Sequence, residues 1–106
     1  MSMDRIATFR AMVAKRPNDP LARFGLANEL LKARAWAEAA EHLRLYLDAY
    51  DDEGNGWGRL GEALAALGDA AGAADALRRG IDASRRFGHA GMADELEARL
   101  EELDEA

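Results

Sequence analysis

The chain has 106 residues, no cysteine and a formal net charge of −6. This length suits a single domain with a modest core, and the lack of cysteine excludes disulfides, thiolate catalysis and Cys-ligated zinc. The acidic balance argues against a nucleic-acid partner. No apolar run approaches the roughly 20 residues that span a bilayer, and the first residues carry no signal pattern. We therefore expect a cytoplasmic protein that does not contact a membrane.

The composition favours an all-α fold. Alanine, the strongest helix former, supplies 24 residues, whereas only four residues are β-branched (Ile6, Thr8, Val13 and Ile81). The spacing of apolar residues predicts about six antiparallel helices joined by short connections. Their expected ranges are 4–16, 20–33, 36–50, 55–67, 70–86 and 90–104.

The first two helices are marked by their apolar spacing and by a start signal. Ile6, Phe9 and Val13 recur at i, i+3 and i+7, which places them on one helix face. Asp19 can cap the second helix, and Pro20 is tolerated at its first position. These signals predict a helix that ends before Pro17 and a new helix that begins at Pro20.

The middle of the chain repeats itself after 34 residues. At this offset Leu26 lies over Leu60, Leu43 over Leu77, and Leu47 over Ile81. Within each unit the apolar spacing predicts two helices. In the second unit Gly68 suits the end of one helix and Asp69 the start of the next. Each unit is therefore predicted to be a helical hairpin.

The last helix carries almost the whole charge imbalance of the chain. Residues 94–106 hold seven acids and one base, Arg99, while residues 1–93 are neutral overall. One apolar stripe, Met92, Leu96, Leu100 and Leu103, runs along this acidic helix. We interpret it as a terminal cap, because the end of a stack needs one polar face. The arginine pairs at 78–79 and 85–86 are expected to attract this helix.

The periodicity also predicts the core. The expected core residues are Phe9, Val13, Leu26, Leu30, Trp36, Ala39, Leu43, Leu47, Trp57, Leu60, Leu64, Ala73, Leu77, Ile81 and Leu96.

The second unit reads Trp57-x-x-Leu60-Gly61-x-x-Leu64, followed by Gly68-Asp69, Ala73, Leu77 and Gly80. This pattern resembles a tetratricopeptide repeat (TPR). The resemblance implies a short right-handed solenoid of stacked helical hairpins that fills one domain, residues 1–106. Its expected parts are a half repeat (4–19), two repeats (20–53 and 54–87) and an acidic capping helix (88–106).

The resemblance further implies a protein–protein interaction module that binds a peptide or helix of a partner protein. In such repeats the first helices of successive units line a concave groove. Carried over by position, the groove residues are Leu21, Phe24, Asn28, Leu31, Asn55, Arg59, Glu62 and Ala66.

Some members of this family hold a C-terminal carboxylate with Lys, Asn and Arg. Asn28 and Arg59 match two of these positions, but Phe24 replaces the lysine. Phe24 and Leu31 instead suggest anchors for an apolar side chain of a partner helix.

Two alternatives remain open. The half repeat could associate with a second copy, which would give a homodimer through repeat edges. An enzyme is the weaker alternative. Gly56-x-Gly58-x-x-Gly61 lacks the preceding strand of a nucleotide site, and the Glu38–His42 pair is more typical of a surface contact than of a metal site. We therefore predict no catalytic residue, no metal and no cofactor.

Overall fold

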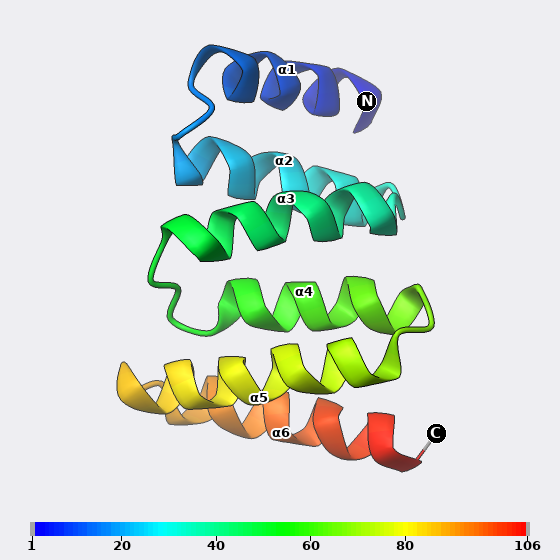
Figure 1. Cartoon of the computed structure of the whole chain (residues 1–106), viewed down its shortest axis with the longest axis vertical. Coiled ribbons are helices and arrows are strands. Elements are labelled where there is room, and N and C mark those ends of the chain that lie inside the picture. Colours follow the sequence, from blue (N-terminus) through cyan, green and yellow to red (C-terminus); the bar gives the residue numbers. More distant parts are fainter. Residues whose placement is uncertain (1, 106) are drawn as a thin grey trace.

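The computed structural model describes residues 2–105 and the side chains of residues 4–104. This part of the chain forms six helices and no strand: α1 (Ser2–Lys15), α2 (Pro20–Lys32), α3 (Trp36–Ala49), α4 (Asn55–Ala66), α5 (Ala70–Arg86) and α6 (Ala90–Glu105). The helices stack one after another along the longest axis, with the two termini at opposite ends (Figure 1). The all-α prediction is confirmed.

The helices alternate between two layers. An ion pair joins Arg10 of α1 to Glu38 of α3, and Leu47 of α3 and Arg79 of α5 line one shared hollow. In the other layer, Arg59 of α4 lies over the ring of Phe24 in α2, and a hollow separates α4 from α6. One layer therefore holds α1, α3 and α5, and the other holds α2, α4 and α6.

The core consists of two clusters built mainly from leucine and alanine, a large one from α1 to α5 and a small one between α5 and α6, and Leu103 packs against both. Most of the predicted core residues are buried, with Leu26, Leu30, Leu43 and Leu96 almost inaccessible. Five of them are only half-buried and pack against the core from its edge: Phe9, Val13, Trp36, Leu47 and Trp57. Tyr46 was not predicted, yet it is buried.

One type of tight turn occurs three times. After α2, α4 and α5, a residue with positive φ follows the helix: Arg34 (60°), Gly68 (81°) and Gly88 (79°). In each turn the next amide bonds back to a carbonyl five residues earlier, as from Asp69 to Leu64. Arg34 therefore adopts the left-handed conformation that glycine takes at the equivalent position of the second repeat.

We expect Arg34→Gly to raise the free energy of unfolding by about 0.5–1 kcal/mol, because glycine removes the steric penalty of a side chain in this region. Arg34 is exposed, so little packing is lost. Urea unfolding checks the gain. Arg34→Ala keeps the steric penalty and is the matched control; an equal gain there would contradict this explanation.

A single carboxylate organises the connection between α3 and α4. Asp52 is buried, and its two oxygens accept hydrogen bonds from the amides of Gly54 and Gly56, both at 2.8 Å, and from the Tyr46 hydroxyl at 2.7 Å. Burial and the Asp52 carboxylate raise the pKa of Tyr46 well above its usual range. The hydroxyl therefore remains a donor, and Asp52 fixes where α4 begins.

Of the four arginines expected to attract the last helix, one forms an ion pair with its described residues. Arg85 pairs with Glu97 of α6, whereas Arg86 reaches back to Asp51 at 2.8 Å. His89 contacts Glu53 at 2.6 Å. These contacts tie the α5–α6 turn to the α3–α4 connection.

Candidate partner-binding groove

Two adjoining hollows form a groove between α4 and α6. The first, of about 150 Å³, is lined by Asn55, Gly58, Arg59, Glu62, Met92, Glu95, Leu96 and Arg99. The second, of about 440 Å³, is lined by Gly61, Glu62, Ala65, Leu77, Arg99, Glu102 and Leu103. Glu62 and Arg99 border both hollows, so the two are neighbours. The first is mainly polar, and the second has an apolar floor formed by Leu77, Leu103 and Ala65.

Aromatic packing connects this groove to α2. Phe24 stacks on Tyr46 with ring centroids 4.6 Å apart, and the Arg59 guanidinium lies 6.0 Å from the Phe24 centroid. A cation at this distance from an aromatic face is attracted by the ring quadrupole. Phe24 therefore helps to place the Arg59 side chain at the edge of the groove.

Two side-chain atoms among the predicted groove residues are buried without a hydrogen-bond partner in the described part of the chain: Asn28 Oδ1 and Arg59 Nε. The first is an acceptor and the second a donor. A buried polar atom that lacks a partner costs about 1–3 kcal/mol, and such atoms are rare in native proteins. Both atoms lie on the helices of the predicted groove, α2 and α4.

The remaining predicted groove residues differ in how much surface they offer. Leu21 is 68% exposed and Leu31 only 6% exposed, so Leu31 belongs to the core. Asn55 and Glu62 line the polar hollow. Ala66 is exposed at the end of α4.

The contribution of α6 to the groove was not predicted. Its side supplies Met92, Glu95, Leu96, Arg99, Glu102 and Leu103. The apolar stripe of this helix was the available signal, but it was interpreted as a cap. In the structure α6 extends the layer of α2 and α4, so it forms the second wall of the groove.

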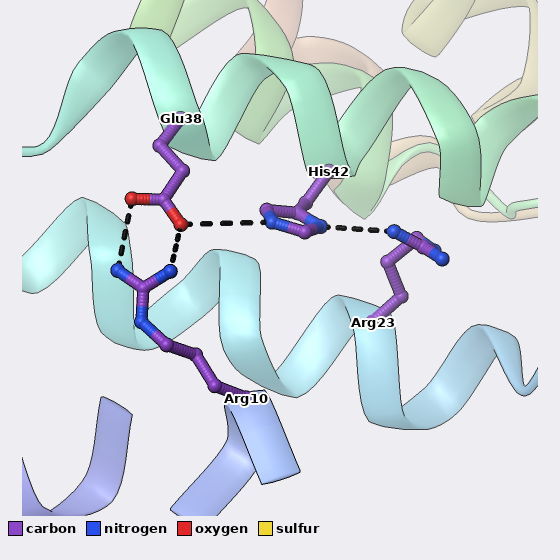
Figure 2. A network of polar contacts seen from close by, with 4 residues as sticks. All are labelled: Arg10, Arg23, Glu38 and His42. Carbon is purple, nitrogen blue, oxygen red and sulfur yellow. Dashed lines mark hydrogen bonds and ion pairs between the residues drawn. The ribbon is translucent and has the colours of Figure 1, made fainter. Parts of the chain in front are cut away.

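A separate polar network joins α1, α2 and α3 (Figure 2). Arg10 forms a paired hydrogen bond with the Glu38 carboxylate, which lowers the pKa of Glu38. On one side of the ring, His42 Nε2 lies 3.7 Å from Glu38 Oε2. On its other side His42 Nδ1 accepts a hydrogen bond from Arg23 at 3.0 Å, because a guanidinium can only donate. The two arginines would repel a metal ion, so this network is structural.

The pKa of His42 lies below its ordinary value of 6.5, because burial penalises the charged ring and Arg23 repels it. Below pH 6.5 the His42 ring is protonated in the unfolded chain but stays neutral in the native protein. The free energy of unfolding therefore falls as the pH falls. We expect a slope of at most about 1.4 kcal/mol per pH unit from this group, and a shallower decline in His42→Gln.

Urea unfolding between about pH 7.5 and pH 5.5 measures this slope while Glu38, whose pKa is lowered from 4.5, stays ionised. His89→Gln is the matched control. An unchanged slope in His42→Gln would contradict the assignment.

Comparisons with known proteins identify the family. The tetratricopeptide repeat family model matches residues 2–84. The chain is 36% identical over 95 residues to the TPR repeat-containing protein PA0015 of Pseudomonas aeruginosa, with 90% of each chain covered. The chain therefore belongs to the tetratricopeptide repeat family. Members of this family generally serve as protein–protein interaction modules.

Solved structures support the same fold. The solution structure of protein BPP2914 from Bordetella parapertussis superimposes with a TM-score of 0.81 at 30% identity, covering 94% of this chain and 87% of that one. The TPR domain of Sgt2 from Aspergillus fumigatus superimposes with a TM-score of 0.73 at 22% identity, covering 95% of this chain and 69% of that one. The expected solenoid of helical repeats is confirmed.

None of the six described helices combines the length and the apolar character needed to cross a bilayer. No three His, Cys, Asp or Glu side chains between residues 4 and 104 are grouped so that they could bind a metal ion.

Proposed function

We propose that this protein binds a segment of a partner protein in the groove between α4 and α6, with α2 at its edge. The observation that carries the proposal is the pair of buried, unpartnered atoms, Asn28 Oδ1 and Arg59 Nε. The first needs a donor and the second an acceptor. A peptide backbone offers both in each residue, as N–H and C=O. Both atoms are covered in this conformation, so the two side chains must turn outward to reach a partner main chain.

The apolar hollow beside Arg59 supplies the second part of the proposed recognition. Its floor includes Leu77 and Leu103, and Gly61 lets α4 pack closely on Leu77, because a Cβ atom there would lie 3.0 Å from that side chain. An apolar side chain of the partner would be desolvated there, at a gain of about 1.5–3 kcal/mol for a leucine-sized group. Phe24 remains available as a second anchor at the α2 edge.

Selection of a random peptide display library on the protein tests this proposal, followed by affinity measurements on Arg59→Met. We expect Arg59→Met to weaken the selected peptides by about 10-fold or more, because a hydrogen bond to a charged group is worth about 1.5–3 kcal/mol. The variant should be at least as stable as the wild type, because methionine keeps the aliphatic packing and removes a buried atom without a partner.

Arg78→Met is the matched control, since Arg78 is an exposed arginine of α5 that does not line the groove. It should bind the peptides like the wild type. Equal affinity of the wild type and Arg59→Met would contradict the groove assignment. A loss of affinity together with a loss of stability would attribute the effect to folding instead.

We propose a non-catalytic module in the cytoplasm that does not bind nucleic acid or membranes. We also propose that the domain consists of a half repeat (4–19), two repeats (20–53 and 54–87) and an acidic capping helix (88–106).

A further inference from the structure

The two ends of the stack carry opposite charge. The exposed basic residues Arg5, Lys15 and Arg16 lie on α1 or directly after it. The exposed acidic residues Asp94, Glu101, Glu102 and Asp104 lie on α6. Because the stack separates α1 from α6 by its full length (Figure 1), the bases of α1 and the acids of α6 cannot pair with each other within one molecule. Arg5 also contacts Glu29 of α2 at 3.5 Å, whereas Lys15 and Arg16 are exposed.

Each end also presents a helix face that no other described residue covers. On α1 this face consists of small or flexible residues: Ala7, Thr8, Ala11, Met12 and Ala14. Met12 is 45% exposed, which is high for a large apolar side chain. On α6 the exposed face centres on Ala98 and is flanked by acids. Small residues allow two helices to approach closely, so the two faces are compatible in shape as well as in charge.

The alternation of the layers supplies the geometry. In both repeats a helix of the α2/α4 layer is followed by a helix of the α3/α5 layer. At the C-terminal end α6 lies in the layer of α2 and α4, and at the N-terminal end α1 lies in the layer of α3 and α5. An α1 helix from another molecule placed after α6 would therefore complete a third pair of the same kind.

We propose that copies of this chain associate head to tail, with α6 of one copy pairing with α1 of the next. The contact is heterologous, since the two faces differ, and repetition of it gives rings or open chains rather than a two-fold dimer. Opposite charges steer the correct ends together.

One antiparallel register places opposite charges at matching heights along the two helices. Arg5 and Lys15 are ten residues apart, and so are Asp94 and Asp104, a distance of about 15 Å along either helix. Placing Lys15 opposite Asp94 brings Arg5 to the height of Asp104, at the flank of the contact, because ten residues turn each helix by about 80° away from the same face. The same register brings Ala11 opposite Ala98 at the centre, where close approach is needed.

Charge reversal tests the proposal through the average mass in solution. In low salt we expect the mass-average of the wild type to about double or more as concentration rises, and this increase to vanish in high salt. Lys15→Glu/Arg16→Glu and Asp94→Lys/Glu101→Lys should each remain monomeric. An equimolar mixture of the two should associate again, because the native α6 of the first meets the native α1 of the second.

Arg44→Glu/Arg78→Glu is the matched control, because it changes the net charge as much as the first variant does but at exposed sites on α3 and α5. It should associate like the wild type. Circular dichroism confirms that each variant is folded. A wild type that stays monomeric at every concentration, or a mixture that stays monomeric, would overturn the proposal.

Disulfide trapping tests the register, because the natural chain has no cysteine. Ala11→Cys/Ala98→Cys should give a ladder of linked copies after oxidation, and Ala11→Cys/Ala66→Cys should not. Each single-cysteine variant should stay unlinked when it is alone. Linked dimers formed by Ala11→Cys or Ala98→Cys alone would indicate a two-fold contact and would overturn the head-to-tail arrangement.

Discussion

Gly54→Ala is expected to lower the free energy of unfolding by about 3 kcal/mol or more, because two penalties combine at this position. Gly54 is buried in the α3–α4 connection with φ of 125°, a conformation that side chains rarely adopt. A Cβ atom there would also overlap the Ser84 hydroxyl and lie 3.0 Å from the Gly80 carbonyl oxygen. Ser84 cannot easily move away, since it is buried and donates a hydrogen bond to that same carbonyl.

Gly68→Ala separates the two penalties. Gly68 has φ of 81°, but a Cβ atom there would meet nothing within 4 Å. Only the backbone penalty of about 1–2 kcal/mol applies. Urea unfolding of both variants measures the difference. Equal losses in the two variants would show that the contact with Ser84 costs nothing.

Asp52→Ala is expected to destabilise the protein by about 3–5 kcal/mol, because three buried donors lose their acceptor at once. These donors are the Gly54 and Gly56 amides and the Tyr46 hydroxyl. A protein of this size has only about 5–15 kcal/mol of stability, so the variant should be partly unfolded at moderate temperature. Thermal and urea unfolding followed by circular dichroism measure the loss.

Two further variants test this explanation. Asp51→Ala removes an exposed neighbour that pairs with Arg86, and exposed ion pairs are worth about 0–1 kcal/mol. Tyr46→Phe removes one of the three donors and should cost about 1–2 kcal/mol. In the double variant with Asp52→Ala, the cost of Tyr46→Phe should largely disappear. Additive losses would contradict a direct bond between the two groups.

The helices and their order were predictable because local signals specify them. Pro20 marks the start of α2, and Gly68-Asp69 marks the turn between α4 and α5, each within a few residues of its own position. The 34-residue offset shows that the same hairpin occurs twice. Arg34 is an exception to the preference for glycine at this turn position, because it has a φ of 60° and the turn still forms. The packing of the repeat therefore determines the backbone there, and the side chain tolerates a modest strain.

The network around Asp52 was not predictable from such signals. In the sequence Asp51, Asp52 and Glu53 form an ordinary acidic connection between helices. Only the fold shows that the second of them is buried against Tyr46. The same holds for Asn28 and Arg59, whose positions followed from the family resemblance but whose unpartnered atoms are visible only in three dimensions.

The groove was predicted in part. Of the positions expected on α4, Asn55, Arg59 and Glu62 line the hollows and Ala66 does not. The last helix, α6, was expected only to cover the end of the stack. A polar helix with one apolar stripe has the same pattern whether it caps a solenoid or forms a groove wall. What distinguishes the two is the layer in which the helix lies, and this depends on the α5–α6 turn.

NMR titration of the protein with a peptide selected on it tests the central claim most directly, because the Arg59 Nε–H gives its own signal. We expect this signal to shift on binding, together with backbone amides of α4 and α6. Perturbations confined to the opposite layer, around Leu47 and Arg79, with an unchanged Arg59 signal would contradict the proposed groove.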